Sequence, residues 1–329
     1  MNQHDPTATT SDTPDQKPAT TPQKWAVWSA QPTSPAATET TNQTTAHYAG
    51  SAVRQTLRRF MRMRASVVCC VLLLLLTTVS VAAPLLATHD PDATDLSSSL
   101  VSPSGDHWLG TDQIGRDTYS RLIYAGRVSL LAAVEALVVS VGIGLPLGLV
   151  AGFARGKTDA IISAVTDAVM AMPGLLLAIA IIGAIGPGLT NAMIAVGVLL
   201  SPRFVRLVRA SVISVRENAY IEAAITSGTS PVRIMGRHVI PNILPPLLVQ
   251  AAFTTGFAML AEASLSFLGL GVQPPQASWG SMLNSAYQTI NQSSFQPIPP
   301  GIAIAVAVLA FNVIGDGLRA SIGREEYRS

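Results

Sequence analysis

The sequence predicts an all-α membrane protein with six membrane-spanning helices. Hydrophobic residues make up 49% of the 329-residue chain and charged residues only 12%, whereas soluble proteins average about 25% charged residues. Lys and Arg are absent from residues 65–115 and again from residues 238–318. Apolar runs long enough to cross a hydrocarbon core of about 30 Å, which takes about 20 helical residues, recur along the chain. A water-soluble enzyme is therefore not expected.

Composition also argues against several other classes. The net charge of +2 is too small for a nucleic-acid binder, which needs a clustered basic face to displace counterions. Cys69 and Cys70 are the only cysteines and are adjacent, so they cannot join distant segments by a disulfide bond. They also lack the spacing of a zinc site, and no metal site is predicted.

The N-terminal region has a different composition from the rest of the chain. Residues 1–50 hold twelve Thr and six Pro, which leaves too little apolar surface to offset the chain entropy lost on folding. Arg54, Arg58 and Arg64 belong to an arginine cluster directly before the first apolar run. We expect residues 1–65 to be a disordered cytoplasmic tail that ends in this basic anchor. A cleaved signal peptide is the weaker interpretation of the first run, because some sixty residues precede it.

Six apolar runs follow in order. They cover residues 67–87, 128–152, 160–182, 188–208, 245–270 and 299–318. Accordingly, residues 66–127 are expected to hold the first span and a long loop, residues 128–318 a five-helix domain, and residues 319–329 a C-terminal tail.

The distribution of charge predicts the orientation of these spans, since Lys and Arg favour the cytoplasmic side in short loops. The loop at 88–120 holds six Asp and a single Arg before position 121, and residues 271–299 hold no charged side chain. Both segments are predicted to lie outside. Arginines gather instead near 155, within 203–237 and after 318, so both termini are predicted to be cytoplasmic.

Glycines near the end of the second span allow two interpretations. The segment from Gly152 to Thr158 resembles a phosphate-binding P-loop but has three residues between its glycines where the motif needs four, and no strand precedes it. ATP binding by this chain is therefore not expected. Gly144, Gly148 and Gly152 recur every fourth residue, which places them on one helix face where a second helix can approach closely.

Three of the four acidic residues inside the expected spans lie away from the span ends, namely Glu135, Asp167 and Glu262. A charge in the middle of a lipid-facing helix costs about 2.5–3.5 kcal/mol or more, so these side chains should face the bundle interior. They could line a substrate path. Alternatively, they accept hydrogen bonds from neighbouring helices or lie nearer the membrane interface than the predicted spans place them; for Glu262 both hypotheses stay open. For Asp167 the second is favoured, because it lies about two turns from the cytoplasmic end. No chain of ionisable groups crosses the membrane, which disfavours an ion-driven carrier.

Residues 215–241 are too ordered in pattern for a simple connector. A short helix around Glu222 is expected to stop at Gly228, and a second to begin with Ser230 as cap and Pro231 at its first position. Glu222 offers a carboxylate and the following alanines allow close approach, which suits a docking surface. An amphipathic helix lying on anionic lipid is the alternative.

The same stretch resembles the EAA loop of membrane subunits of ATP-binding-cassette importers, through Glu222-Ala223-Ala224, Gly228 after three further residues, and the closing Ile240-Pro241. Further segments resemble one branch of that family, the C-type permease subunit of dipeptide and oligopeptide importers. The resemblance covers about residues 66–323, and the segments that carry it are 107–117, 120–124, 261–275, 278–280, 300–301 and 309–319. Glu135 departs from the second span of that family.

The resemblance implies a type I importer permease fold with 128–318 as the permease domain, in a bacterial inner membrane. It implies a sister permease subunit, two ATPase subunits or a fused pair that carry ATP and Mg²⁺, and an extracytoplasmic binding protein that delivers peptide. This chain would then hold no cofactor and be no enzyme itself. The ATPase contact carried over from the family is Glu222, Ala223, Ala224 and Gly228, with Pro231, His238 and Pro241 shaping the loop. An outer-loop motif without an assigned role also matches, at Leu109, Gly110, Thr111, Asp112, Gly115, Arg116 and Asp117.

Two alternatives remain beside a peptide importer. Importers of nickel chelates and other small solutes resemble the same branch, so the sequence leaves the cargo open. A self-sufficient secondary carrier belongs to a different class and is motivated only by the acidic residues in the spans.

Overall fold

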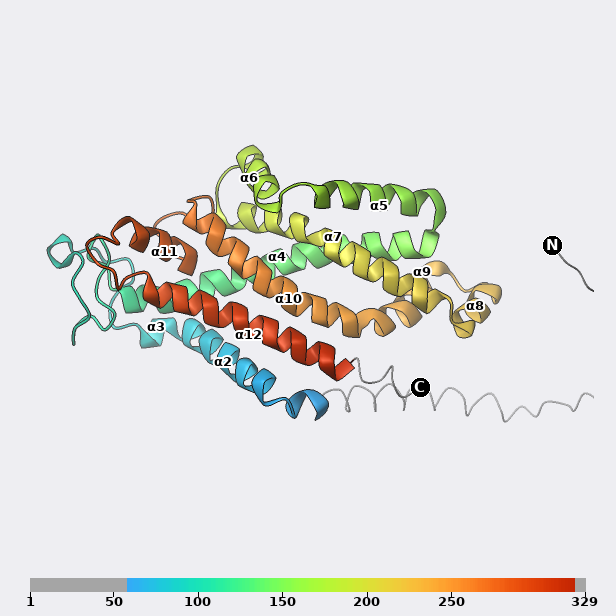
Figure 1. Ribbon diagram of the computed structural model, residues 1–329, viewed down its shortest axis with the longest axis horizontal. Helices are drawn as coiled ribbons and strands as arrows, with labels where there is room; N and C mark the ends of the chain where they lie inside the picture. Colours follow the sequence, from blue (N-terminus) through green and yellow to red (C-terminus); the bar gives the residue numbers. More distant parts are fainter. Residues whose placement is uncertain (1–57, 323–329) are drawn as a thin grey trace, which may run out of the picture. The chain divides into compact units, whose positions relative to one another are not determined.

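The computed structural model describes residues 58–322 (Figure 1). Expectations for the remainder of the N-terminal tail and for the last residues of the C-terminal tail lie outside the described residues. Within them, five helices are long and apolar enough to cross a membrane. They are α2 (Arg64–Val81), α4 (Thr118–Ala154), α7 (Leu189–Arg216), α10 (Ile240–Phe267) and α12 (Ile298–Ile322).

Shorter helices connect these five. They are α3 (Ala83–Leu86), the 3-10 turn η1 (Leu96–Ser98), α5 (Gly156–Ala171), α6 (Gly174–Ile185), α8 (Ala219–Thr226), α9 (Pro231–Ile234), the π-helical turn η2 (Met235–Val239) and α11 (Trp279–Gln288). The first, second, fourth, fifth and sixth predicted spans are confirmed as long apolar helices. Their ends differ from the prediction, above all for α4, which begins at Thr118 instead of residue 128.

The third predicted span, residues 160–182, is wrong as a single helix. It is divided between α5 and α6, which meet at a bend of 97°. Pro173 lacks a backbone N–H and disfavours helical backbone at the residue before it, and Met172 is accordingly extended, with φ −81° and ψ 139°. Each piece is too short to span the membrane alone, so a sixth span exists only if the bent pair is counted as one.

The closest helix pair is α4 with α7, and the glycines predicted to allow such packing are confirmed in that role. A Cβ on Gly148 would lie 2.6 Å from Val208 Cβ, and one on Gly152 would lie 2.7 Å from Val212 Cβ. A Cβ on Gly144 would overlap Phe204 of the same helix α7. Small residues at this seam let the two backbones approach, which is how helices associate where the hydrophobic effect cannot drive them together.

The remaining long helices pack around this pair. Helix α10 contacts α4, α7 and α12, while α2 lies along α12 and also touches α4 (Figure 1). Most of the buried apolar residues in α4, α7, α10 and α12 form one core. On helix α2, Val68, Val71 and Leu74 are each at least 60% exposed. An apolar surface of this kind is unfavourable in water but stable against lipid.

Two ends of the bundle carry different loops (Figure 1). Helices α8 and α9 lie at one end, beside a second apolar cluster that includes Leu149 of α4, Val212 of α7 and Ile243 of α10. At the opposite end, residues 87–117 form a loop that closes over the start of α4. These two loops hold most of the residues that the sequence singled out.

Candidate functional site

Helix α8 has one buried side and one exposed side. Ile221 is fully buried and packs in the apolar cluster with residues of α4, α7 and α10, and Ala224 is half-buried against the same cluster. Glu222 and Ala223 are exposed. Within residues 58–322 the carboxylate of Glu222 has neither an ion pair nor a hydrogen bond. The helix therefore presents an unpaired carboxylate beside a small side chain.

Gly228 ends α8 in the way its sequence predicts. Its φ is +75°, a left-handed conformation that residues with a Cβ rarely adopt. The N–H of Gly228 donates to Ile225 O at 3.0 Å, and the N–H of Thr229 donates to Ala224 O at 3.1 Å. This pair of hydrogen bonds is a Schellman motif, which satisfies the last carbonyl groups of the helix.

The second predicted helix of this loop is present but is a single turn. Helix α9 begins with Pro231 after Ser230, as expected, although the Ser230 side chain makes no capping hydrogen bond. It then continues through the π-helical turn η2 into α10, so that Pro231–Phe267 is one helical run of 37 residues. Pro241 lies at the start of α10. Because proline has no backbone N–H, it cannot donate a hydrogen bond to the preceding turn of the helix. The turn after α8 is therefore joined directly to a long helix of the bundle.

A polar contact also joins α8 to α10. Asn242 donates its side-chain N–H to Tyr220 Oη at 3.2 Å and to His238 O at 2.6 Å. The rings of Tyr220 and His238 lie 6.1 Å apart, centroid to centroid. His238 is half-buried with its ring near that of Tyr220, whereas Glu222 is exposed. With Ile221, these contacts make α8 a rigid attachment to the bundle.

Glu262 is the acidic residue that the structure places deepest. Its side chain has no exposed surface, and it accepts hydrogen bonds from Ser129 of α4 at 3.2 Å and from Ser266 at 2.7 Å. Ser129 in turn accepts a hydrogen bond from the backbone N–H of Trp279 at the start of α11. The carboxyl group therefore joins α4, α10 and α11, which supports the hypothesis of hydrogen bonding between helices over that of a path lining.

The other two acidic residues differ from Glu262. Asp167 accepts a hydrogen bond from Arg206 of α7 at 2.7 Å, which agrees with the favoured hypothesis of a contact with a neighbouring helix, although its side chain is exposed within this chain. It lies where α5 runs beside the arginine-bearing half of α7, and it can therefore stay in contact with an arginine without burial. Glu135 is half-buried on α4 and has neither ion pair nor hydrogen bond among residues 58–322.

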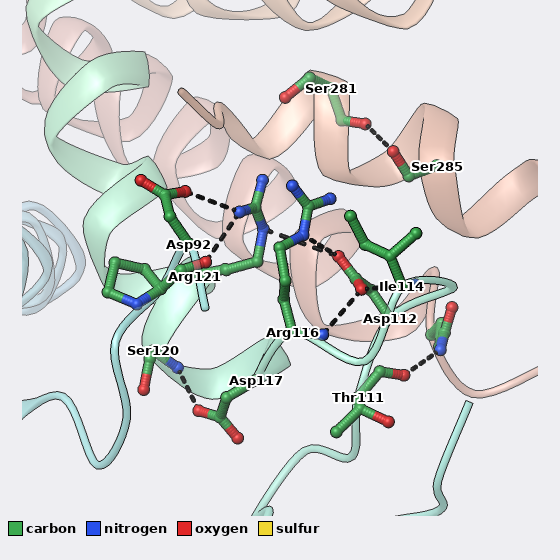
Figure 2. A network of polar contacts seen from close by, with 12 residues as sticks. Asp92, Thr111, Asp112, Ile114, Arg116, Asp117, Ser120, Arg121, Ser281 and Ser285 are labelled. Carbon is green, nitrogen blue, oxygen red and sulfur yellow. Dashed lines mark hydrogen bonds and ion pairs between the residues drawn. The ribbon is translucent and has the colours of Figure 1, made fainter. Parts of the chain in front are cut away.

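At the opposite end of the bundle, the outer loop is organised around Asp112 (Figure 2). Its carboxylate accepts hydrogen bonds from the backbone N–H groups of Ile114 and Arg116, each at 3.0 Å, and from Arg116 Nε at 2.7 Å. Arg121 of α4 lies 3.9 Å from the same carboxylate and donates to Pro91 O at 2.8 Å and to Asp92 at 3.1 Å. Arg121 thereby connects the segment after α3 with the motif at 109–117.

Asp117 caps α4. Its Oδ2 accepts the N–H of Ser120 at 2.8 Å, and its Oδ1 lies 2.9 Å from His107 Nδ1. Burial opposes ionisation of this carboxyl, but the hydrogen bonds from Ser120 and His107 outweigh it and lower the pKa of Asp117 below its ordinary value. A negative charge at a helix N-terminus is also favoured by the helix dipole.

Four members of the motif remain, namely Leu109, Gly110, Thr111 and Gly115. A Cβ on Gly115 would overlap the carbonyl oxygen of Asp95, and its φ is +77°. Thr111 O accepts a hydrogen bond from the side chain of Gln296, which precedes α12. Gly110, the remaining glycine of the motif, has φ +73°, whereas Leu109 is half-buried. The motif thus forms a folded cap that fastens the loop to the bundle.

A family model for the binding-protein-dependent transport system inner membrane component matches residues 144–325, which is more than half of the chain. The chain belongs to this family. A second model, the N-terminal transmembrane domain of oligopeptide transport permease C, matches residues 51–103. The protein is therefore a permease component of a bacterial ABC importer, a multi-pass membrane protein, and members of this family are not themselves enzymes.

Curated relatives cover most of the chain. A dipeptide transport system permease protein from Alkalihalophilus pseudofirmus is 39% identical over 82% of this chain and 88% of its own length. A nickel transport system permease protein from Escherichia coli is 42% identical over 70% of this chain and 83% of its own length. A glutathione transport system permease protein from Pectobacterium atrosepticum is 38% identical over 82% of this chain and 90% of its own length.

The fold itself matches a solved structure. The inward-facing MetNI methionine ABC transporter aligns with a TM-score of 0.52 at 20% identity, and the match covers 61% of this permease and 96% of that chain. At this identity the likeness shows the fold alone. It confirms the predicted type I importer permease architecture.

Sequence reasoning missed several residues of this ABC permease. Arg121, His89 and Gln296 join segments far apart in sequence, and nothing in their spacing indicates that they meet. Ser129 and Trp279 complete the Glu262 network in the same way. One signal was available: Asp117 stands three residues before Ser120 at the start of an apolar stretch, a pattern typical of a helix N-cap.

Proposed function

We propose that this permease is the membrane-spanning subunit of an ATP-driven importer of dipeptides or oligopeptides, and that α8 is the surface on which a partner ATPase docks. The observation that carries the docking role is the exposed Glu222, which has no ion pair among residues 58–322 and stands next to Ala223 on a helix anchored by buried Ile221. A carboxylate forms strong charge-assisted hydrogen bonds when an arginine of a partner protein faces it. A helix adapted to lie on anionic lipid would present basic side chains in the place of this carboxylate. The exposed Tyr220 and Ile225 of α8 suit either surface.

Charge supports the proposed orientation. The end of the bundle with α8 carries Arg155, Arg216 and Arg233, whereas the outer loop is rich in aspartate. By the preference of basic loops for the cytoplasm, α8 faces the cytoplasmic ATPases and both termini are cytoplasmic. The cap at 109–117 then faces the extracytoplasmic binding protein, and a sister permease completes the translocation path.

Coupling follows from the attachments of α8. ATP and Mg²⁺ bind the ATPase subunits, and this chain holds no cofactor. When the ATPases close, each docked helix moves with its ATPase, and Gly228, Pro231 and Pro241 shape the short connection by which α8 shifts α10. A rigid attachment passes such a displacement on as rotation of whole elements, which opens the bundle alternately to either side.

Charge reversal on α8 tests the docking role. The Glu222→Lys variant, assembled with its sister permease, ATPases and binding protein in proteoliposomes, should insert normally but lose most ATP-dependent uptake. Glu217→Lys is the matched control, because Glu217 is exposed on the same loop and its pair with Arg155 at 3.9 Å is exposed and weak. Equal uptake by both variants would remove Glu222 from the docking surface.

The turn after α8 gives a second test. Proline cannot adopt the positive φ of Gly228 or donate its N–H to Ile225 O. The Gly228→Pro variant should therefore insert and assemble but hydrolyse ATP without transport. Normal uptake by this variant would show that the turn has no part in coupling.

The cargo proposal rests on relatives whose names refer to dipeptide transport, and a nickel permease is similarly related. Because a separate binding protein selects the solute in such systems, the deciding measurement is mass spectrometry of the ligand that copurifies with the binding protein captured by this permease. Peptides would support the proposal, and a nickel chelate would replace it.

A self-sufficient carrier is the remaining alternative. Its motivation is weakened because Asp167 is paired with Arg206 and Glu262 is hydrogen-bonded between helices. Uptake by this chain alone in liposomes, driven by an ion gradient and indifferent to ATP, would establish that alternative.

A further inference from the structure

Three side chains from the outer loop converge beside the start of α4. His89 follows α3, His107 opens the motif at 107–117, and Asp117 caps α4. One ligand atom from each, a ring nitrogen or a carboxylate oxygen, lies within 4.8 Å of the other two. His107 Nδ1 lies 2.9 Å and His89 Nδ1 3.9 Å from Asp117 Oδ1, and the two imidazole rings are 4.6 Å apart between centroids.

The donor set indicates the class of ligand. Two neutral imidazoles and one carboxylate suit borderline transition cations such as Zn²⁺, while Mg²⁺ and Ca²⁺ prefer sites made wholly of oxygen. Ligands bonded at about 2.0–2.1 Å to a tetrahedral Zn²⁺ lie about 3.4 Å apart. The two separations from Asp117 Oδ1 lie on either side of this value, so a bound cation requires His107 to move slightly away from Asp117. It also requires His89, whose side chain is 42% exposed, to rotate toward Asp117 and leave its contact with Thr88 Oγ1 at 3.1 Å.

Helix capping alone does not account for the cluster. The cap needs only Asp117 Oδ2, which accepts the Ser120 N–H at 2.8 Å and the Thr88 hydroxyl at 3.3 Å. Both imidazoles instead surround Oδ1, the other oxygen of the same carboxylate. Hydrogen bonds to one oxygen of a carboxylate orient the second one, as the outer contacts of metal-binding carboxylates do.

The backbone near His89 is fixed as well. The N–H of His89 donates to Ser120 Oγ at 3.1 Å, and Ser120 lies in the first turn of α4. His107 Nδ1 is held by Asp117, and the ring is only 20% exposed. His107 and Asp117 are therefore already side by side, with a hydrogen bond between them that a cation would replace, and His89 is tethered close to both.

We propose that His89, His107 and Asp117 form a binding site for one divalent transition cation of the Zn²⁺ type on the outer face of this permease. Three protein ligands leave a fourth position for water, on the side where His89 is exposed. The cation joins the segment after α3, the outer-loop motif and the N-terminus of α4. Since these segments are distant in sequence, the cation stabilises the cap by closing the loops between them.

Zinc binding to the full-length chain tests this proposal. The chain is purified in detergent with a tag that contains no histidine and dialysed to equilibrium against Zn²⁺, and bound metal is counted by elemental analysis. We expect one Zn²⁺ per chain, with an affinity at least about tenfold weaker in His89→Ala and in His107→Ala. A large excess of Mg²⁺ should not displace it.

Matched controls separate this site from other metal-binding groups. His238→Ala removes a histidine at the opposite end of the bundle, and a Cys69→Ser/Cys70→Ser variant removes both thiols; each should bind Zn²⁺ as the unmodified chain does. X-ray absorption of the bound zinc should show two imidazoles and no sulfur. Sulfur ligation, or the same Zn²⁺ binding in the His89→Ala/His107→Ala double variant, would overturn the proposal.

Thermal unfolding shows whether a substitution acts by removing a metal ligand or by destabilising the fold. His89 is partly exposed, so His89→Ala should unfold near the temperature of the unmodified chain when a chelator is present. Zn²⁺ should raise the unfolding temperature of the unmodified chain and leave that of His89→Ala unchanged. The same rise in both chains would show that the stabilising zinc binds elsewhere.

Discussion

Glu262 shows how hydrogen bonds from neighbouring helices can accommodate an acidic residue in the middle of an apolar bundle. Its carboxyl group has no exposed surface and accepts hydrogen bonds from Ser129 and Ser266. Through Ser129 it is also linked to the N–H of Trp279. A buried polar network of this kind fixes the relative positions of the elements that contribute to it.

Substitution of Glu262 distinguishes this structural role from a path lining. The Glu262→Leu variant leaves two buried hydroxyl groups without their acceptor and should lower the free energy of unfolding by about 1–3 kcal/mol, whereas Glu262→Gln should lose less. Unfolding in detergent measures both. If Glu262→Gln kept its stability but changed the transport rate, the carboxyl group would belong to the translocation path.

Gly115 is the residue of the outer cap that tolerates substitution least. An added Cβ would overlap the carbonyl oxygen of Asp95, and φ of +77° is unfavourable for residues other than glycine. We expect Gly115→Ala to destabilise the cap by about 1–3 kcal/mol. Gly105 lies in the same loop, and no atom comes within 4 Å of the place that its Cβ would take, so Gly105→Ala should be neutral.

Limited proteolysis at the outer loop measures this difference. Faster cleavage of Gly115→Ala than of Gly105→Ala is the expected result. Cleavage at equal rates would contradict the tight packing of the cap on Asp95.

For single residues, the sequence predicts backbone conformation better than it predicts side-chain contacts. The left-handed turn at Gly228 follows from its position after a short helical stretch, because glycine alone adopts that conformation freely. The long-range partners of Asp112 and Asp117 could not be predicted, since Arg121 and His89 approach them only when the segment after α3 packs on α4. Resemblance to a family marked the motif but gave no physical reason for it.

Among the secondary-structure elements, α4 and α7 form the seam on which the bundle is built. Gly148 and Gly152 of α4 face Val208 and Val212 of α7 at distances that leave no space for a methyl group. Such a seam follows from the spacing of the glycines, because residues four apart share one helix face. The seam was therefore predictable from the sequence, although its partner helix was not.

Enlarging one seam residue should separate the two helices. We expect Gly148→Ala to lower the free energy of unfolding by about 1–3 kcal/mol, as overpacking does. Gly142, on the same helix, has no atom within 4 Å of a Cβ, so Gly142→Ala should be neutral or slightly stabilising through its helix propensity. Unfolding in detergent compares the two, and equal stability would show that the seam is not close-packed.

Helices α5 and α6 mark the limit of the hydropathy argument. Their combined run is apolar enough to be one span, and only Pro173 indicates a break. A proline in a membrane helix is compatible with a kink as well as with a full bend, so the sequence could not fix the angle of 97°. Whether the chain forms a kink or a full bend at Pro173 depends on how α6 packs against α7.

At the scale of the whole molecule, the proposed function requires that a displacement of α8 reach the bundle. Ile221 is the side chain through which it does so, because it is fully buried between α4, α7 and α10. The contact of Tyr220 with Asn242 adds a second, polar connection. Under the proposed function, the exposed face of α8 is the docking face and its buried face is the one that passes the movement to the bundle.

Removal of the Ile221 side chain should therefore impair both stability and coupling. The Ile221→Ala variant leaves a cavity at the base of α8, which should lower the free energy of unfolding by about 2–4 kcal/mol. In the assembled importer, we expect ATP hydrolysis to continue while uptake per ATP falls, because α8 can move with the ATPase without carrying α10 along. The ratio of uptake to hydrolysis in proteoliposomes measures this loss.

Ile225 supplies the matched control, since it lies one turn later on the same helix and is 42% exposed. The Ile225→Ala variant removes the same atoms without opening an internal cavity, so its stability should change by less than about 0.5 kcal/mol. A fall in uptake at Ile225→Ala with ATP hydrolysis reduced in proportion would mark Ile225 as part of the docking face. An unchanged ratio of uptake to hydrolysis in Ile221→Ala would instead show that movement reaches the bundle by the Tyr220 contact or through the chain itself, and the role assigned to the buried face of α8 would be wrong.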